Sequence, residues 1–308
     1  MSEDRDYLVP DWDSCEGGEG LRGLFSGPLA ERRHASIATV GDLVRGLSAL
    51  FPPTDAEPWD KTGLLAGDAS WPIGGVATAL DPTVEAVRQA QACGANVLLT
   101  HHPAYLDAPA PVCPRSSGGS AAGAVVFEAL SRGVALVNYH TALDVSAPAQ
   151  HMLPGMLSLE RVGVLEPLAR DSELGYGQVC AVASADRPMT LESLALRCTA
   201  VFGRAPRVWG APDKQVESVV TWTGSAGPAA EECLERGVDA LICGEVKYHA
   251  ALDAASAGLG IIELGHDVSE LPFAAVLAQA CASIGVSRES ISCLAQDANW
   301  IHPESRRV

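Results

Sequence analysis

The stretch VLLTHHP, residues 97–103, decides the predicted fold. Its apolar run has no period, which is typical of a buried strand in a parallel sheet. Ligands of open α/β sheets bind beyond the carboxyl ends of the strands, so His101 and His102 lie where chemistry is expected. Neighbouring strand residues point to opposite faces, and both imidazoles reach one site only if the backbone turns, which Pro103 favours. The alternative is a pair of surface histidines in a loop.

Alternating strands and helices surround this stretch. Two right-handed strand–helix–strand units are predicted, one over 76–100 and one over 96–139 that shares the strand at 96–100. Residues 104–120 are rich in Pro, Ser and Gly, and we expect a long loop there, which could cover the site because it directly follows His102 and Pro103. The sequence therefore predicts an α/β domain with a parallel sheet.

The segments on either side of these units are less regular. Thr39 is predicted to cap a helix over 40–51. The polar segment 59–68, WDKTGLLAGD, is interpreted as a surface loop, and residues 145–160 show no regular pattern. A different α/β block begins at about residue 162, with strands expected at 179–184, 206–210, 219–224, 239–244 and 260–265 and helices at 191–203, 229–237 and 245–258. A C-terminal helix is expected to begin near Ser269.

Composition and charge narrow the class of protein. A chain of 308 residues can form one large domain or two of ordinary size. The formal charge of −17, without a basic stripe, disfavours nucleic acid and anionic membranes as partners. Nine cysteines without a CxxC pair indicate free thiols rather than disulfides or a zinc knuckle. Because no apolar run approaches the roughly 18 residues of a membrane span and no secretory signal is recognisable, we expect a cytoplasmic protein.

Three predicted strands end in clusters of histidine and carboxylate. Such groups at strand ends suit a divalent ion of the Zn²⁺, Mn²⁺, Fe²⁺ or Co²⁺ type, and five ligands are enough for two ions that share a carboxylate. The alternative is that these are unrelated capping and surface residues, with Glu270 a helix N-terminal charge. The clusters are His101 with His102, His140 with Asp144, and His266 with Glu270.

Two further segments remain open to more than one interpretation. Glu245 and His249 lie one helical turn apart in GEVKYH and form either a ligand pair or a helix-start carboxylate with an exposed histidine. We favour Glu245 as a residue that lines a pocket. The turn at 223–227, TGSAG, could accept a phosphate through its backbone amides.

Six segments in order resemble the dinuclear-metal-centre family labelled GTP cyclohydrolase I type 2 homologues, also described as yeast adaptor interacting-factor-like proteins. They are WDKTGLLAGD (59–68), LLTHHP (98–103), HTALD (140–144), TWTGSAG (221–227), GEVKYH (244–249) and GHDVSE (265–270). The resemblance implies two α/β domains, the first discontinuous, with a dinuclear metal cleft between them. The first domain would comprise 37–150 plus 266–308 and the second 160–265, after a flexible acidic extension at 1–36.

The resemblance also implies a site and an assembly. The ligands of two divalent ions (Zn, Fe, Mn or Co) would be His101, His102, Asp144, His266 and Glu270. His140 would orient a ligand or transfer a proton, and Glu245 would lie close by with a catalytic role. Similar proteins form ring-like homohexamers. The chain departs from the family pattern in its extension, in the loop at 104–120 and in VSAPAQ at 145–150.

Two classes of function follow from this site. The first is a metal-dependent hydrolase that acts on GTP, as the cyclohydrolase label implies, or on another nucleotide or phosphate-bearing small molecule. The second is a non-enzymatic metal-binding protein, either a carrier or store or a regulatory interaction protein. The residues that would recognise guanine cannot be identified from the sequence.

Overall fold

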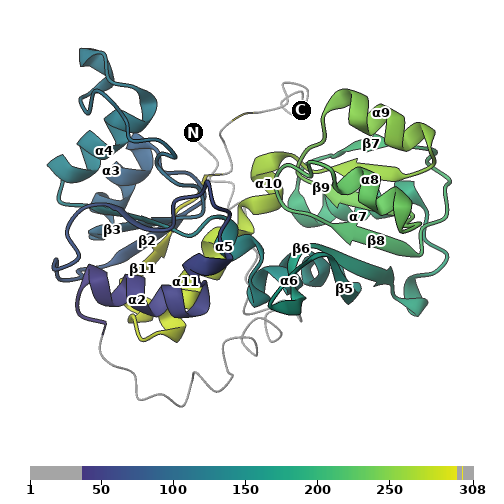
Figure 1. The fold of residues 1–308 in the computed structure, drawn as a ribbon, viewed down its shortest axis with the longest axis horizontal. Coiled ribbons are helices and arrows are strands. Elements are labelled where there is room, and N and C mark those ends of the chain that lie inside the picture. Colours follow the sequence, from purple (N-terminus) through teal and green to yellow (C-terminus); the bar gives the residue numbers. More distant parts are fainter. Residues whose placement is uncertain (1–36, 297–299, 301–308) are drawn as a thin grey trace, which may run out of the picture.

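The computed structural model describes residues 37–296 and Trp300, so the predicted extension at 1–36 lies outside the described residues (Figure 1). The described part folds into two α/β halves, each built on its own sheet. The first sheet has the strand order β1-β4-β3-β2-β11 and the second β5-β6-β8-β9-β10-β7. The last strand of the chain joins the sheet of the first half, which confirms the two-domain α/β fold with a discontinuous first domain.

The first sheet is parallel except at one edge. The apolar stretch around Leu98 forms a fully buried strand, as predicted, because helices cover both faces of the sheet. Leu98 packs against the layer of α3 and α4, whereas Leu99 packs against α2 and α11. The strands are β1 (Gly63–Ala66), β2 (Val76–Ala79), β3 (Val97–Thr100), β4 (Ala135–Asn138) and β11 (Ile291–Cys293), and the helices are α2 (Val40–Leu50), α3 (Val84–Ala92), α4 (Ala121–Ser131) and α11 (Pro272–Ser283).

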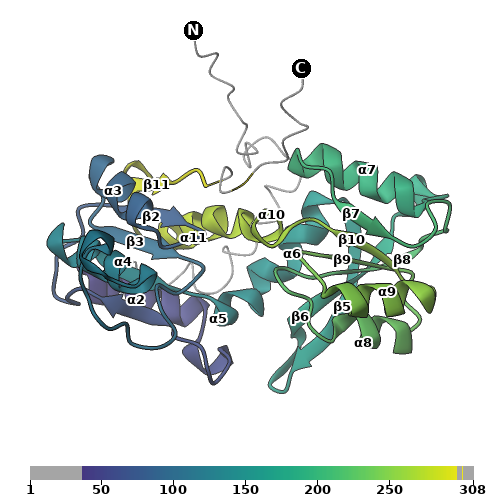
Figure 2. The ribbon, with the colours of Figure 1, turned by 90° about the horizontal axis from the view of Figure 1, so that it is seen from above.

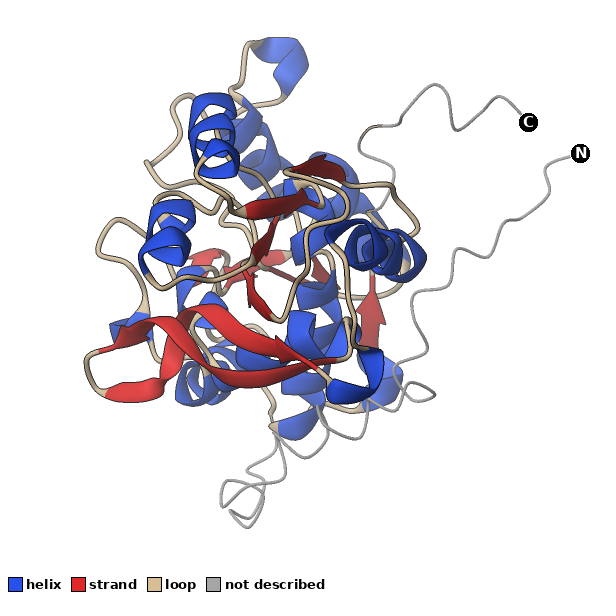
Figure 3. Ribbon diagram, turned by 90° about the vertical axis from the view of Figure 1, so that its right-hand side faces the viewer, coloured by secondary structure: helices blue, strands red, loops and turns tan. Residues whose placement is uncertain are grey.

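The second sheet is mixed. β8, β9 and β10 are parallel, and β5, β6 and β7 pair antiparallel to their neighbours. β5 and β6 form a long hairpin that is prominent in Figure 3. α7 packs on one face, and α8 and α9 pack on the other. The elements are β5 (Leu159–Leu168), β6 (Asp171–Val182), α7 (Leu191–Phe202), β7 (Arg207–Trp209), β8 (Ser218–Thr221), α8 (Ala229–Glu235), β9 (Ala240–Cys243), α9 (Tyr248–Ser256) and β10 (Gly260–Glu263).

Short helices connect the halves. α5 (Thr141–Asp144) and α6 (Ala147–Met156) lead from the first half to the hairpin, and α10 (His266–Glu270) leads back from β10 into α11. In Figure 2, α10 and α11 lie between the two sheets. The described part of the chain also contains short 3₁₀ helices, which are η1 (Pro53–Asp55), η2 (Arg115–Ser117), η3 (Ser184–Asp186) and η4 (Arg288–Ser290). Within the described part of the chain, no helix combines the length and the apolarity that crossing a membrane requires.

Three expectations about local structure were wrong. Segment 59–68 is not only a loop, because Gly63–Ala66 forms the edge strand β1, antiparallel to β4. Residues 145–160 contain α6 despite Pro154 in its interior, since Met152 and Leu153 are buried and their packing outweighs the lost hydrogen bond. The C-terminal helix expected from near Ser269 is divided in two, because the short helix α10 ends at Glu270 and α11 begins at Pro272, which lies in its first turn.

Candidate metal centre

The paired histidines stay tied to the sheet after β3 ends. The backbone N–H of His101 donates to the Ala79 carbonyl at 3.2 Å, and that of His102 donates to the Leu80 carbonyl at 3.0 Å. The Thr100 hydroxyl donates to the His102 carbonyl at 2.7 Å. These bonds fix the backbone at the carboxyl edge of the sheet, where the two imidazoles enter the same site, with ring centroids 5.0 Å apart.

The buried His101 side chain is oriented by contacts behind it. Its Nδ1 lies 3.2 Å from the Tyr139 carbonyl, to which the protonated nitrogen donates, and its ring stacks on Phe273 at 4.5 Å. Its Nε2 faces Asp144 Oδ1 at 3.6 Å and Glu270 Oε1 at 3.8 Å and has no hydrogen-bond partner. An unsatisfied buried polar atom costs about 1–3 kcal/mol. An imidazole nitrogen that faces two carboxylates beyond hydrogen-bond distance fits a divalent cation between them.

His102 and His266 both contact the other oxygen of Glu270. His102 Nε2 lies 2.9 Å from Glu270 Oε2, and His266 Nε2 lies 3.1 Å from the same atom. The second nitrogen of His102 lies 2.8 Å from Asp81, and that of His266 lies 3.1 Å from Glu245. Each imidazole therefore has a carboxylate at its outer nitrogen, as is usual for metal-binding histidines, while its other nitrogen faces Glu270.

These contacts raise the pKa of both imidazoles. Burial acts to lower the pKa of His102, but hydrogen bonds with Asp81 and Glu270 outweigh it and raise the value to about 10. The hydrogen bond with Glu270 raises the pKa of His266 to about 9, with a smaller contribution from Glu245. Without a metal, both groups are protonated at neutral pH.

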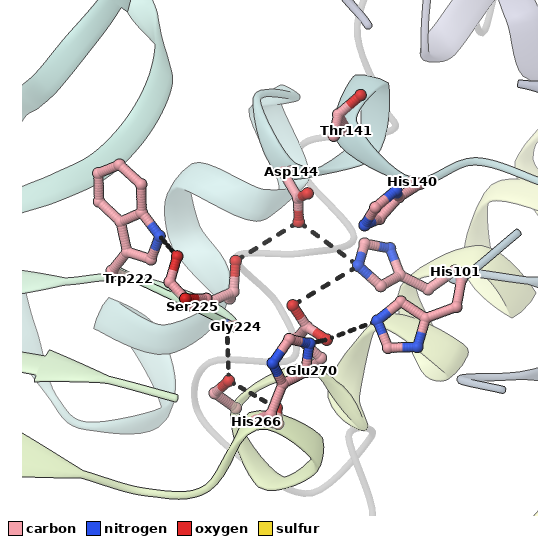
Figure 4. A network of polar contacts seen from close by, with 12 residues as sticks. His101, His140, Thr141, Asp144, Trp222, Gly224, Ser225, His266 and Glu270 are labelled. Carbon is pink, nitrogen blue, oxygen red and sulfur yellow. Dashed lines mark hydrogen bonds and ion pairs between the residues drawn. The ribbon is translucent and has the colours of Figure 1, made fainter. Parts of the chain in front are cut away.

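The pKa values of the two carboxylates in the cluster shift in opposite directions. Glu270 is buried, which acts to raise its pKa, but the surrounding imidazoles hold the pKa well below the usual range. Burial raises the pKa of Asp144, and repulsion by Glu270 adds to this effect, against the attraction of His101. Glu270 is thus the permanent negative charge at the centre of the cluster, which Figure 4 shows between His101 and His266.

His140 lies at the edge of the cluster and is oriented by a buried carboxylate. Its Nδ1 is 3.2 Å from Asp60 Oδ1, and its ring centroid is 5.1 Å from that of His101. The backbone N–H and hydroxyl of Thr141 donate to Asp60 at 3.0 and 2.6 Å. Burial acts to raise the pKa of Asp60, but the bonds with His140 and Thr141 outweigh it and lower the value to about 2.

The turn at 223–227 supports the cluster from the second half. The N–H of Gly224 donates to Ser269 Oγ at 2.9 Å, and that of Ala226 donates to the Glu245 carbonyl at 3.0 Å. These two amides therefore stabilise the protein itself rather than a phosphate. The Thr223 hydroxyl donates to Asp144 at 3.4 Å. The cluster thus lies where the two halves meet.

The predicted site residues have different positions relative to this cluster. His101, His102, His140, Asp144, His266 and Glu270 come together in it; among the described residues, three overlapping groups of these side chains have ligand atoms close enough for a metal ion. Glu245 reaches the cluster only through His266. The alternative ligand pair of Glu245 with His249 does not form, because Glu245 precedes α9 and His249 is exposed.

Two carboxylates were not assigned a role from the sequence. Asp60 lies in the quoted segment WDKTGLLAGD, and Asp81 lies within the predicted strand–helix–strand unit over 76–100. Asp81 lies just beyond Leu80 at the end of the strand β2, which is the parallel neighbour of β3. That adjacency was a usable signal, because the ends of neighbouring parallel strands meet at one edge of the sheet.

A cavity of about 620 Å³ opens beside the cluster. His102 and His266 form part of its wall, together with Glu245 and Asp81. Glu245 was predicted to line a pocket, and it does. A cavity of this volume is in the range of small-molecule sites.

Comparisons with known proteins agree with this architecture. The family model described as Duf34/NIF3 (NGG1p interacting factor 3) matches residues 38–293. A GTP cyclohydrolase 1 type 2 homolog of Streptomyces coelicolor is 30% identical over 241 residues, covering 76% of this chain and 82% of the relative. A protein of the same name from Clostridium acetobutylicum is 27% identical over 78% of this chain and 88% of its own length.

Solved structures share the fold. A Bacillus cereus protein related to NIF3 superposes with a TM-score of 0.77 at 20% identity, covering 87% of this chain and all of that one (100%). A Staphylococcus aureus hypothetical protein superposes with a TM-score of 0.75 at 22% identity, covering 87% and 99%.

Proposed function

Because the chain belongs to the Duf34/NIF3 family, as the six sequence segments predicted, we propose that it is a hydrolase that depends on two divalent metal ions per chain. One observation carries this proposal: the two oxygens of the buried Glu270 face different sets of ligands. A carboxylate shared in this way is typical of two-ion sites, where it offsets the repulsion between the cations.

We assign the ligands by the oxygen that they face. His102 and His266 would hold one ion together with Glu270 Oε2, and His101 and Asp144 would hold the other with Oε1. Imidazole and carboxylate ligands suit Zn, Fe, Mn or Co, and availability decides among them.

The chain's own residues supply orientation and proton transfer. Two bound ions would acidify a water and polarise the substrate. We assign His140 as the group that accepts and returns a proton at Nε2, because Asp60 accepts the hydrogen bond from Nδ1–H and fixes the ring. Glu245 would hold Nδ1–H of His266 and so set the direction of its Nε2. The substrate class we propose is GTP, as in the name of the relatives, or another phosphate-bearing small molecule.

The proton-transfer role is tested by separating turnover from metal binding. We expect His140→Gln to lower kcat by roughly 10²–10⁴-fold, as is usual for the loss of a general acid or base, while metal content stays at the wild-type level. The measurement is steady-state hydrolysis of a panel of nucleotides and phosphoesters, beside elemental analysis. His249→Gln is the matched control, since this histidine is exposed outside the cluster. An unchanged kcat in His140→Gln would remove His140 from the mechanism.

Metal affinity should rise with pH. The pKa values of His102 and His266 are raised to about 10 and about 9, so a cation must displace their protons at neutral pH. Affinity should therefore increase between pH 6 and pH 9, by about tenfold per pH unit for each proton released. Competition with a chromophoric chelator measures this slope. His266→Asn should make it shallower, and an affinity independent of pH would contradict the assignment of these two ligands.

A second candidate is a non-enzymatic metal carrier or regulatory protein. The exposure of His266, at 41% of its side chain, favours exchange of an ion with a partner. Two bound ions per chain without turnover of any substrate in the panel would favour this alternative.

We also propose a cytoplasmic homohexamer. The assembly is supported by the family resemblance, and the location by the composition of the sequence. Size-exclusion chromatography with light scattering tests the assembly: the mass of six chains is expected, and the mass of one chain would contradict it.

A further inference from the structure

The cavity beside the metal centre contains a guanidinium group that is already oriented. Arg207, at the start of β7, lines the cavity with its side chain 61% exposed. Its Nε and Nη2 donate to the two oxygens of Glu263 at 2.5 and 2.8 Å. Among the residues that the structure describes, Nη1 of Arg207 has no hydrogen-bond partner, so its two N–H groups remain available to a ligand.

The Glu263 carboxylate, which orients Arg207, accepts further hydrogen bonds from the protein. Glu263 is buried and also accepts hydrogen bonds from Trp209 Nε1 at 2.6 Å and from the Val246 N–H at 2.9 Å. It holds the guanidinium in one orientation before any ligand binds. Because side-chain ordering is a cost of binding, this arrangement favours affinity for a planar or tetrahedral anion.

The second guanidinium of the cavity is arranged differently. Arg204 donates to both oxygens of Asp267 at 3.0 and 2.9 Å, and its face lies over the Trp300 ring at 4.2 Å. Since the chain carries a net charge of −17, an anionic ligand needs local positive charge. Arg207 offers this charge together with unoccupied donors.

We propose that the cavity holds the part of the substrate that is not hydrolysed, and that Arg207 binds a phosphate group on that part. This inference rests on the proposed function, because it places the reacting end of the same molecule at His102 and His266 in the cavity wall. The volume of about 620 Å³ exceeds what one phosphate needs and accommodates a nucleotide-sized molecule. Arg207 is thus the residue that selects a phosphate-bearing substrate over its uncharged analogue.

The test compares guanosine monophosphate with guanosine by isothermal titration calorimetry. Both are titrated into full-length protein, once loaded with zinc and once treated with EDTA. Because charge-assisted hydrogen bonds to Arg207 would form only with the phosphate, the wild type should bind the monophosphate at least about tenfold more tightly than guanosine in both metal states. Arg207→Gln should abolish this preference and leave the affinity for guanosine unchanged.

Two further variants keep the test decisive. Arg207→Lys retains a charge for Glu263 but lacks the second pair of N–H groups, and it should lose the preference while it folds as the wild type does. Arg187→Gln is the matched control, since it breaks a surface ion pair with Glu217 away from the cavity. A preference that persists in both Arg207 variants would overturn the proposal. So would a preference that only EDTA treatment removes, because the ions would then hold the phosphate.

The outcome also separates this inference from the proposed function. Phosphate preference that depends on Arg207, without turnover of any substrate, would support the binding role and contradict the hydrolase. Turnover without phosphate preference would support the hydrolase and overturn the role of Arg207.

Discussion

Glu270→Gln is expected to abolish binding of both ions at the proposed metal centre. The glutamine keeps the volume of the side chain but replaces the shared charge by a neutral amide, whose nitrogen cannot bind a cation. Because one carboxylate oxygen faces His102 and His266 and the other faces His101, no ligand set remains intact. Bound metal should fall from about two ions per chain to well below one, and hydrolysis should fall with it. Elemental analysis after gel filtration measures the ratio.

The matched control for this variant is Glu245→Gln. The Glu245 carboxylate lies 3.1 Å from the outer nitrogen of His266, not from the nitrogen that faces Glu270, and the Glu245 side chain is 54% exposed. Its replacement should therefore lower metal affinity by far less than the replacement of Glu270. Full metal occupancy in Glu270→Gln would show that this carboxylate is not shared by two ions.

Gly224→Ala is expected to weaken metal binding strongly although Gly224 itself offers no ligand. An added Cβ would lie 2.2 Å from Glu270 Oε1, and the backbone φ of +62° disfavours any residue other than glycine. The carboxylate must leave the position in which its Oε1 faces His101, so metal affinity should fall by roughly 10–100-fold, as when the groups that orient metal ligands are lost. Chelator competition measures the affinity, and circular dichroism shows whether the fold is kept.

Gly227→Ala separates the two effects of this substitution. Gly227 lies in the same turn with φ of +48°, and its added Cβ would meet no atom within 4 Å. It shares the backbone strain but not the contact with Glu270. Equal losses of metal affinity in the two variants would mean that strain in the turn, rather than displacement of Glu270, is responsible.

The sequence predicted those parts of the site that follow from strand ends. The position of His101 and His102 could be predicted because a continuous apolar run, typical of a buried parallel strand, ends at them. The carboxyl ends of parallel strands lie together at one edge of the sheet. His266 and Glu270 could be connected to them because a third predicted strand also ends in a histidine–carboxylate cluster, and the resemblance implied the same ligand set. Their contact depends on how α10 leads back into the first half, which no local pattern encodes.

The other differences between the predicted and the observed structure come from tertiary contacts. α6 forms around Pro154 because its apolar side chains are buried between the halves, and packing there outweighs local propensity. β1 is short and interrupted by glycine, so its pairing with β4 decides its structure. Asp60 could not be assigned because a carboxylate that orients a histidine has no characteristic spacing in the sequence, whereas the position of Asp81 after the strand β2 was a signal that could have been used.

The measurement that tests the central claim most directly is a crystal structure of the metal-loaded wild type, with anomalous diffraction recorded at the edge of the bound metal. Two peaks are expected on either side of the Glu270 carboxylate, one beside His102 and His266 and the other beside His101 and Asp144. A single peak, or peaks beyond bonding distance of Glu270 (about 2.0–2.2 Å for zinc and oxygen), would contradict it.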